Sequence, residues 1–225
     1  SNFARIGDGS LGGKGRGLAF LDRLLTRHED LNGVWMKDDG TQYPDGAVQT
    51  MIPKTVVLCT DIFDEFMDAN ELYPLALSDL DDSKILDAFL NAHLPDRLLS
   101  DFEAFFDVVK GPIAVRSSSM LEDSHYQPFA GVYSTYMIPF DDDKYKRIEN
   151  LAHAVKAVYA SVFFRSSKDY MTATSNLIDQ EKMAVILQEV VGEKHGDRFY
   201  PVISGVARSV NYYPIGDEQA EEGTV

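Results

Sequence analysis

The sequence contains a single cysteine, and it contains no apolar run of the ~18 residues that a membrane span requires. One thiol, Cys59, cannot form an internal disulfide, which fits a reducing compartment. No signal peptide is recognisable at the start of the chain. These absences predict a cytoplasmic protein with no membrane partner.

Positive charge is also scarce. The chain has 21 Lys and Arg against 36 Asp and Glu, a formal net charge of -15 at pH 7. Nucleic acids and anionic membranes bind basic faces, because such faces displace counterions. The charge balance therefore predicts no nucleic acid partner. A nucleotide such as ATP remains compatible, since a few cations can form a local positive pocket.

The most informative stretch surrounds Arg116. Residues 113–115 form a short apolar run that predicts a strand, and this strand leads into Arg116 and three consecutive serines at 117–119. A guanidinium offers a planar fork of donors that matches phosphate oxygens, so the stretch predicts an anion site. A structural alternative stays open, in which Arg116 pairs with Glu122 or Asp123 and the serines cap a helix.

A second candidate lies near the start of the chain, where several glycines surround Lys14 and Arg16. Glycines let backbone amides approach a phosphate closely. Leucines at 18, 21 and 25 follow a helical stripe, so we expect the glycine loop to lead into a helix N-terminus that favours anions. The alternative is a flexible lead-in to the helix with solvated basic residues.

Two nucleotide motifs can be compared with this loop. Residues 7–12 match the glycine spacing of the dinucleotide fingerprint, but we find no convincing strand before them. The P-loop pattern fails, because Lys14 is followed by Gly15 rather than Ser or Thr. An NAD-binding dehydrogenase therefore remains an alternative, and it predicts nicotinamide binding that is insensitive to Arg116→Ala.

Taken in order, the motifs resemble one family along nearly the whole chain, the pyruvate phosphate dikinase and phosphoenolpyruvate synthase group. The Ala-Val-Arg-Ser-Ser and Phe-Ala-Gly segments are the specific ones. The segments that carry the resemblance are residues 12–15, 52–63, 114–118, 122–124, 129–131, 135–136, 184–191 and 204–206.

The resemblance is to the N-terminal nucleotide-binding domain of that family. It implies an α+β, ATP-grasp-like fold with helices packed on mainly antiparallel sheets. It also implies that Lys14 and Arg116 hold the ATP phosphates, that Thr135 is a further nucleotide contact, and that Gln188 is an adenine or hinge contact. An amide does present donors and an acceptor to an adenine edge, although Gln188 is equally readable as a polar residue at a strand end.

In the family, ATP phosphorylates a histidine on a mobile domain, which then phosphorylates pyruvate or another acceptor such as a glucan or an antibiotic. None of the five histidines here has the context of that carrier. The family's magnesium-binding carboxylates and its Gln-x-Arg element do not follow Gly216. We therefore expect Mg²⁺ ligands, phosphohistidine domain and acceptor domain to lie outside this chain, and the chain alone to be inactive.

One departure from the family pattern leaves a further alternative open. Relatives follow the Ser-Gly-Val segment with an aromatic residue, a threonine and an Asn-Pro pair, whereas residues 207–211 here read Ala-Arg-Ser-Val-Asn. A non-catalytic nucleotide-binding regulatory module would fit such a change.

For domain organisation, we expect residues 1–225 to form part of one ATP-grasp domain, with a helical and mixed part at about 1–110 and a strand-rich part with a long central helix at 111–225. The chain begins without methionine and ends amid acidic residues, so we expect the native protein to continue in both directions. Expected helices cover 61–70, 83–94, 95–111 and 145–172, expected strands cover 55–59, 132–138, 183–191 and 200–207, and a loop or hairpin covers 29–51.

Overall fold

The computed structural model describes residues 1–28, 37, 39–42, 44, 48–120, 133–173 and 181–224. The chain divides into two compact units, Ser1–Val190 and Val191–Val225, and each is described by itself. Most of the expected loop at 29–51 lies outside the described residues, as do Glu122, Asp123 and the Phe-Ala-Gly segment at 129–131.

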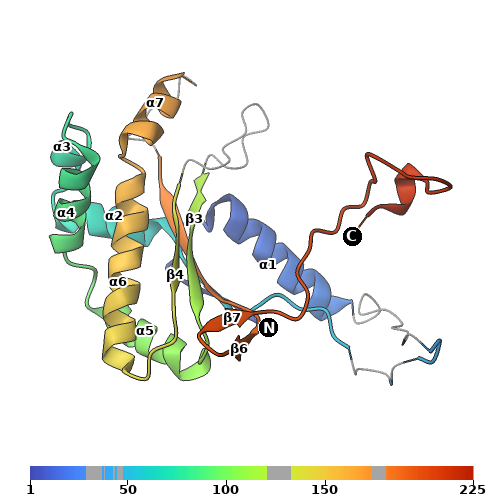
Figure 1. Cartoon of the computed structure of the whole chain (residues 1–225). Helices are drawn as coiled ribbons and strands as arrows, with labels where there is room; N and C mark the ends of the chain where they lie inside the picture. Colours follow the sequence, from blue (N-terminus) through green and yellow to red (C-terminus); the bar gives the residue numbers. More distant parts are fainter. Residues whose placement is uncertain are drawn as a thin grey trace. The chain divides into compact units, whose positions relative to one another are not determined.

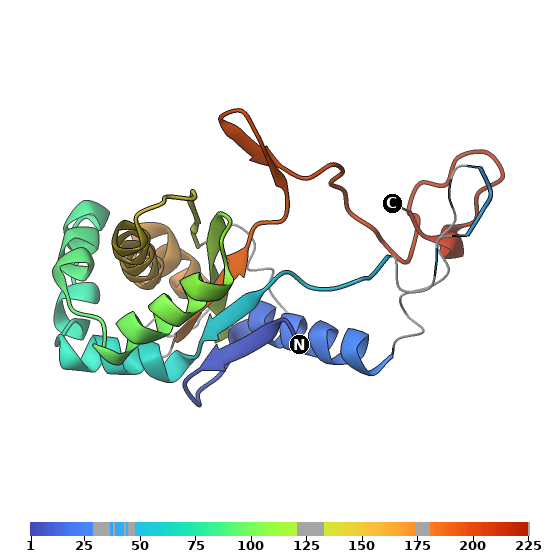
Figure 2. The ribbon, with the colours of Figure 1, turned by 90° about the horizontal axis from the view of Figure 1, so that it is seen from below.

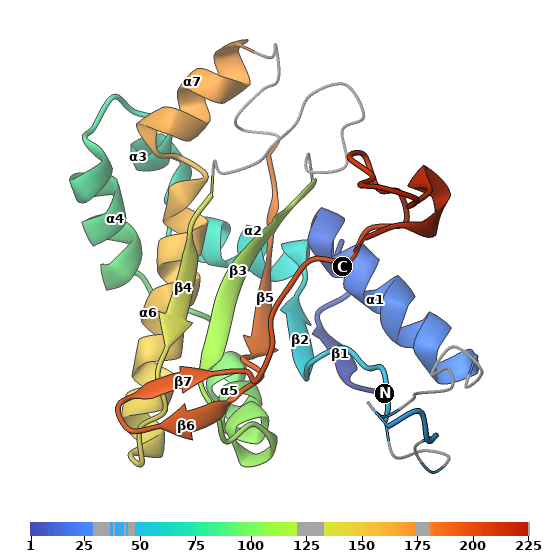
Figure 3. The ribbon, with the colours of Figure 1, turned by 45° about the vertical axis from the view of Figure 1, so that its right-hand side comes forward.

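The first unit is built on a five-stranded sheet with the order β1-β2-β5-β3-β4, as Figure 3 shows. β1 and β2 are parallel, and the other neighbours are antiparallel. This confirms the expected α+β fold with a mainly antiparallel sheet. The sheet takes strands from both sides of residue 110. Its strands are β1 (Phe3–Ile6), β2 (Thr55–Leu58), β3 (Ile113–Ser119), β4 (Thr135–Ile138) and β5 (Met183–Glu189).

Helices cover both faces of this sheet (Figures 1 and 2). Helix α1 (Gly12–Arg27) lies on one face, and the remaining helices lie on the opposite side. No helix in the described ranges combines the length and apolar composition that would let it cross a membrane. The remaining helices of this unit are α2 (Thr60–Ala69), α3 (Tyr73–Ala76), α4 (Asp82–Asn91), α5 (Arg97–Val108), α6 (Lys144–Ser161) and α7 (Arg165–Ala173).

Each strand contributes to two cores, because successive side chains of a strand point to opposite faces of a sheet. Val185 and Leu187 of β5 belong to the large core beneath the helical layer, whereas Ala184 and Ile186 belong to a small core. Leu18 of α1 packs against the small core. The helical layer is therefore the main source of hydrophobic stabilisation, and α1 covers only part of the other face.

The aromatic residues of α5 are core residues, since Phe102, Phe105 and Phe106 are buried. Leu99 of the same helix is apolar but 47% exposed. Cys59 is fully buried. Burial, with the Asp61 carboxylate nearby, raises the pKa of its thiol to about 11, so the thiol is protonated and unreactive at neutral pH.

In the first unit, one expected helix is wrong and one strand was not predicted. The long helix at 145–172 is interrupted between α6 and α7, where Phe163 turns into the core and the Ser167 hydroxyl donates a hydrogen bond to the Ser161 carbonyl at 2.6 Å. The side-chain hydroxyl thus replaces the backbone donor that a continuous helix would supply. A strand, β1, also precedes the glycine loop, where none was expected. Its four residues carry a weak pattern and pair in parallel with β2.

The second unit contains a short antiparallel hairpin of β6 (Glu193–His195) and β7 (Arg198–Tyr200), followed by irregular chain and a short 3₁₀ helix at Ala220–Glu222. The expected strand at 200–207 is wrong, because pairing ends at Tyr200. The apolar side chains that suggested it, Val202, Ile203 and Val206, are exposed. These residues are apolar, as a strand would require, but within the described part of the chain they pair with no other strand.

Candidate functional site

The start of α1 is pressed against β3. The helix begins at Gly12, so Lys14 lies in its first turn. The sequence instead suggested that Lys14 lies in a loop before the helix. Gly12 has a φ of +67°, and a Cβ atom there would lie 2.0 Å from the carbonyl oxygen of Ser118. Only glycine fits this approach. Gly12 therefore serves the close packing of a helix on a strand.

Ser118 fixes this contact with one hydroxyl group. Its Oγ donates to the Leu11 carbonyl at 2.7 Å and accepts from the Gly15 backbone N–H at 2.9 Å. Ser118 is fully buried, so both bonds are shielded from water. A central serine of the run that follows Arg116 thus holds the helix that carries Lys14.

Lys14 and Arg116 are the two cations expected to bind phosphates. Lys14 contacts the residue of β3 that follows Arg116. The Lys14 Nζ donates a hydrogen bond to the Ser117 carbonyl at 3.2 Å. Ser117 follows Arg116 directly in the strand. Lys14 and Ser117 are 103 residues apart in the sequence. The fold therefore brings Lys14 close to the strand segment that contains Arg116.

Arg116, Thr135 and Gln188 share one face of the sheet. Arg116 lies opposite Thr135 in the β3–β4 pair, and Gln188 lies opposite Ala114 in the β3–β5 pair. Ala114 and Arg116 are two residues apart, so their side chains point the same way. The Arg116 Nη1 donates to the Gln188 Oε1 at 2.9 Å. This is the face on which α1 lies, because Ile186, which is opposite Arg116, belongs to the small core that Leu18 of α1 packs against.

Thr55 of β2 joins this group, and the sequence did not single it out. It lies opposite Gln188, and the Gln188 Nε2 donates to its Oγ1 at 3.0 Å. Both ends of the Gln188 amide are thus hydrogen-bonded within the protein. A threonine at the start of an apolar strand carries no signal of its own, and only the register with β5 reveals its partner.

The loop before α1 binds an internal carboxylate. Asp61 accepts hydrogen bonds from the backbone N–H groups of Asp8 at 2.9 Å and Gly9 at 3.0 Å, while the Thr60 hydroxyl oxygen accepts from Ser10 N at 2.9 Å. Asp61 itself lies in the first turn of α2, whose N-cap position is Cys59. Burial would raise the pKa of Asp61, yet the backbone donors outweigh it and lower the pKa.

This arrangement changes the interpretation of the glycine fingerprint. A strand, a glycine-containing turn and a helix do follow one another here, as a dinucleotide site requires. However, the amides of Asp8 and Gly9, which such a site would turn toward a pyrophosphate, are bound to the Asp61 carboxylate. The cationic face near Arg116 is therefore the better candidate for an anion.

Metal binding finds no support in the part of the chain that the structure describes. No group of three or more His, Cys, Asp or Glu side chains is placed there so that it could hold a metal ion. The described residues therefore offer no preformed site of three such side chains for the Mg²⁺ that the family resemblance implies.

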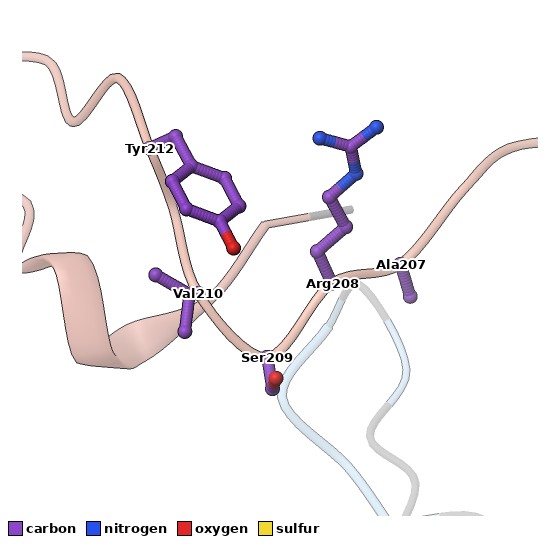
Figure 4. Close-up of a pocket in the computed structure, with 5 residues that line it drawn as sticks. All are labelled: Ala207, Arg208, Ser209, Val210 and Tyr212. Atoms are coloured by element: carbon purple, nitrogen blue, oxygen red, sulfur yellow. The ribbon is translucent and has the colours of Figure 1, made fainter. Parts of the chain in front are cut away.

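The second unit has a pocket of its own, with a volume of about 460 Å³. It is lined by Ala207, Arg208, Ser209, Val210 and Tyr212, which Figure 4 draws. Backbone hydrogen bonds between Arg208 and Thr224 hold this segment. The pocket contains none of the four expected site residues.

Comparisons with known proteins identify the family of this chain. The family model for the AMP/ATP-binding domain of pyruvate phosphate dikinase matches residues 9–224. An uncharacterized phosphotransferase of Bacillus subtilis (strain 168), YvkC, is 28% identical over 140 residues, which are 62% of this chain. The matched region spans only 16% of that relative's length. From residue 9 to residue 224, the chain belongs to the pyruvate phosphate dikinase family, as its AMP/ATP-binding domain.

Proposed function

We propose that this chain is the ATP-binding portion of a dikinase-type phosphotransferase. ATP bound here phosphorylates a histidine on another domain, which then delivers the phosphoryl group to pyruvate or another acceptor. The observation that carries the proposal is the placement of Lys14, Arg116, Thr135 and Gln188 along β3, between Ala114 and Ser117, in a chain of the AMP/ATP-binding family.

In this proposal Arg116 and Lys14 hold the phosphates. The guanidinium uses Nη1 to reach Gln188, and its planar fork has further N–H donors for phosphate oxygens. Lys14 acts as a point charge at the first turn of α1, where the helix dipole adds to the attraction for an anion. Thr135, which is exposed opposite Arg116, supplies a hydroxyl contact to the nucleotide.

The remaining parts of the reaction are assigned to the rest of a longer protein. The matched region covers 16% of the Bacillus subtilis phosphotransferase, so most of a protein of that kind lies beyond this region. We assign Mg²⁺ ligands, the phosphohistidine and the acceptor site to such domains, and we expect no turnover by this chain alone. We further propose that residues 1–225 are part of one ATP-grasp domain of a cytoplasmic protein.

The test is a calorimetric titration of Mg-ATP and, separately, NAD into the longer protein, followed by an assay for AMP. ATP binding with AMP release supports the dikinase reaction. NAD binding without ATP binding would contradict the proposal. Parallel titrations of Lys14→Ala and Arg116→Ala are expected to show weaker ATP binding with an unchanged circular dichroism spectrum.

A non-catalytic nucleotide-binding regulatory module is the second candidate. It is favoured by the altered residues 207–211, of which 207–210 line the separate pocket of the second unit. It predicts ATP binding by the longer protein with no AMP formed. The AMP assay therefore separates the two functions, whereas binding alone does not.

A further inference from the structure

A buried polar network lies beside Arg116. Thr55 is 2% exposed and Gln188 is 9% exposed, so both side chains are nearly removed from water. Buried amides and hydroxyls lower stability unless they are hydrogen-bonded. Here three side chains from three adjacent strands satisfy one another: Thr55 of β2, Gln188 of β5 and Arg116 of β3.

The direction of each hydrogen bond in this network is determined by Pro53. The Thr55 Oγ1 donates its proton to the Pro53 carbonyl at 2.8 Å, and a carbonyl can only accept. A hydroxyl has one proton, so Thr55 must accept from Gln188. Gln188 therefore turns its amide NH₂ toward Thr55 and its oxygen toward Arg116. The reverse orientation would place two donors, the amide and the guanidinium, against each other.

The oxygen of Gln188 holds the guanidinium without neutralising it. A carboxylate at this position would form an ion pair with Arg116 and compete with phosphate for the same donors. A neutral amide oxygen restricts the side chain while the full positive charge stays available. The sheet register places the amide where this is possible, because Gln188 lies directly opposite both Thr55 and the small Ala114.

We propose that Gln188 and Thr55 are positioning residues for Arg116, with Thr55 setting the orientation of the Gln188 amide. The inference rests on the proposed function, in which Arg116 binds the phosphates of ATP. It changes the expected role of Gln188, which acts on the phosphate site through Arg116 rather than by reading the base.

The experiment compares three ligands, ATP, GTP and inorganic tripolyphosphate, the last of which has no base. Dissociation constants are measured for the wild-type protein and for Thr55→Val, Thr55→Ser and Gln188→Met. Thr55→Val keeps the shape and removes the hydroxyl. We expect Thr55→Val and Gln188→Met each to weaken the binding of all three ligands by a similar factor, about 5- to 10-fold, because one buried hydrogen bond is lost. Thr55→Ser retains the hydroxyl and should restore affinity.

A matched control is Ser167→Ala, which removes a buried hydroxyl of α7 on the other side of the sheet. It should leave all three affinities unchanged. If Gln188→Met lost affinity for ATP and GTP but kept its affinity for tripolyphosphate, the inference would be overturned. Gln188 would then contact the base of the nucleotide. Equal affinities of Thr55→Val and wild type for tripolyphosphate would overturn it as well.

The same experiment distinguishes a failure of the proposed function. If the wild-type protein bound neither ATP nor tripolyphosphate, or if Arg116→Ala bound them as the wild type does, the phosphate site itself would be wrong and the inference with it. If Arg116→Ala lost binding of ATP and tripolyphosphate while the Thr55 and Gln188 variants kept it, the phosphate site would be supported. The positioning role of Gln188 and Thr55 would be wrong.

Discussion

The three serines that follow Arg116 are chemically identical but have different roles. Ser117 offers its carbonyl to Lys14, Ser118 bridges α1 to β3, and the Ser119 hydroxyl is buried with no hydrogen-bond partner among the described residues. The sequence predicted a polar run beside an arginine. It could not separate the three residues, because each role depends on which element packs against that position.

This difference gives a direct comparison. Ser118→Ala leaves the Leu11 carbonyl and the Gly15 N–H without their shared partner, and we expect it to lower the free energy of unfolding by about 1–3 kcal/mol. Ser119→Ala removes an unsatisfied polar group and should be neutral or stabilising. Urea unfolding of both variants checks the prediction, and equal losses in the two would contradict it.

Asp61 makes the stability of the glycine loop depend on pH. Its pKa is lower in the folded protein than the usual value of 3.8, because the donors from Asp8 and Gly9 outweigh the effect of burial. The folded state therefore favours the ionised carboxylate, and its contribution is present above about pH 4 and is lost as the pH falls through the lowered pKa.

Asp61→Asn tests this contribution. We expect it to destabilise the protein by about 1 kcal/mol at pH 7, because an amide oxygen replaces a charged acceptor. The difference between wild type and variant should shrink as the pH falls from 5 toward 3, since the wild-type carboxyl becomes protonated. Urea midpoints measured across that range give the result, and a difference that is constant with pH would argue against the loop contact.

At the scale of elements, α1 depends on the absence of side chains at its start. Gly12→Ala would place a methyl group 2.0 Å from the Ser118 carbonyl oxygen at a positive φ of +67°, so the helix would have to move away from β3. We expect a loss of about 2 kcal/mol or more and weaker nucleotide binding, since Lys14 moves with the helix.

Gly17→Ala is the matched control in the same helix. A Cβ atom there meets nothing within 4 Å, and the residue is exposed. Alanine is the better helix former, so this variant should be stabilised by up to about 1 kcal/mol. Thermal unfolding of the two variants is the measurement. If both variants were destabilised, close packing against β3 would not explain the effect of Gly12→Ala.

The sequence predicted the central strands and the main helices correctly, and the reason is their apolar pattern. β2 and β5 are mostly apolar, β3 begins with the apolar residues 113–115, and most residues of these strands are buried in the sheet. β1 was missed because its four residues are only partly buried, and the break between α6 and α7 was missed because a helical pattern continues through Phe163. Local periodicity does not indicate where tertiary packing interrupts an element.

At the scale of the whole molecule, the candidate site depends on long-range register. Arg116 and Lys14 were predicted individually from charge and glycine context, and Thr135 and Gln188 from the family resemblance. Their placement side by side along the middle of β3 requires the strand order β1-β2-β5-β3-β4, which no local pattern encodes. Thr55 was missed for the same reason: its partner Gln188 lies 133 residues away in the sequence.

The chain also contains its own control for the phosphate site. Arg165 is followed by two serines, as Arg116 is, but it is exposed at the start of α7, among the helices on the far side of the sheet from α1. If general positive charge attracted ATP to this acidic protein, the two arginines would matter equally. If the site is built as described, only Arg116 matters.

The most direct test of the central claim is therefore a calorimetric titration of ATP into the wild-type protein, Arg116→Ala and Arg165→Ala at one salt concentration. A phosphate site at β3 predicts that Arg116→Ala weakens binding about 10- to 100-fold, as expected for lost hydrogen bonds to a charged ligand, while Arg165→Ala binds like the wild type. Binding by Arg116→Ala with wild-type affinity would contradict the account.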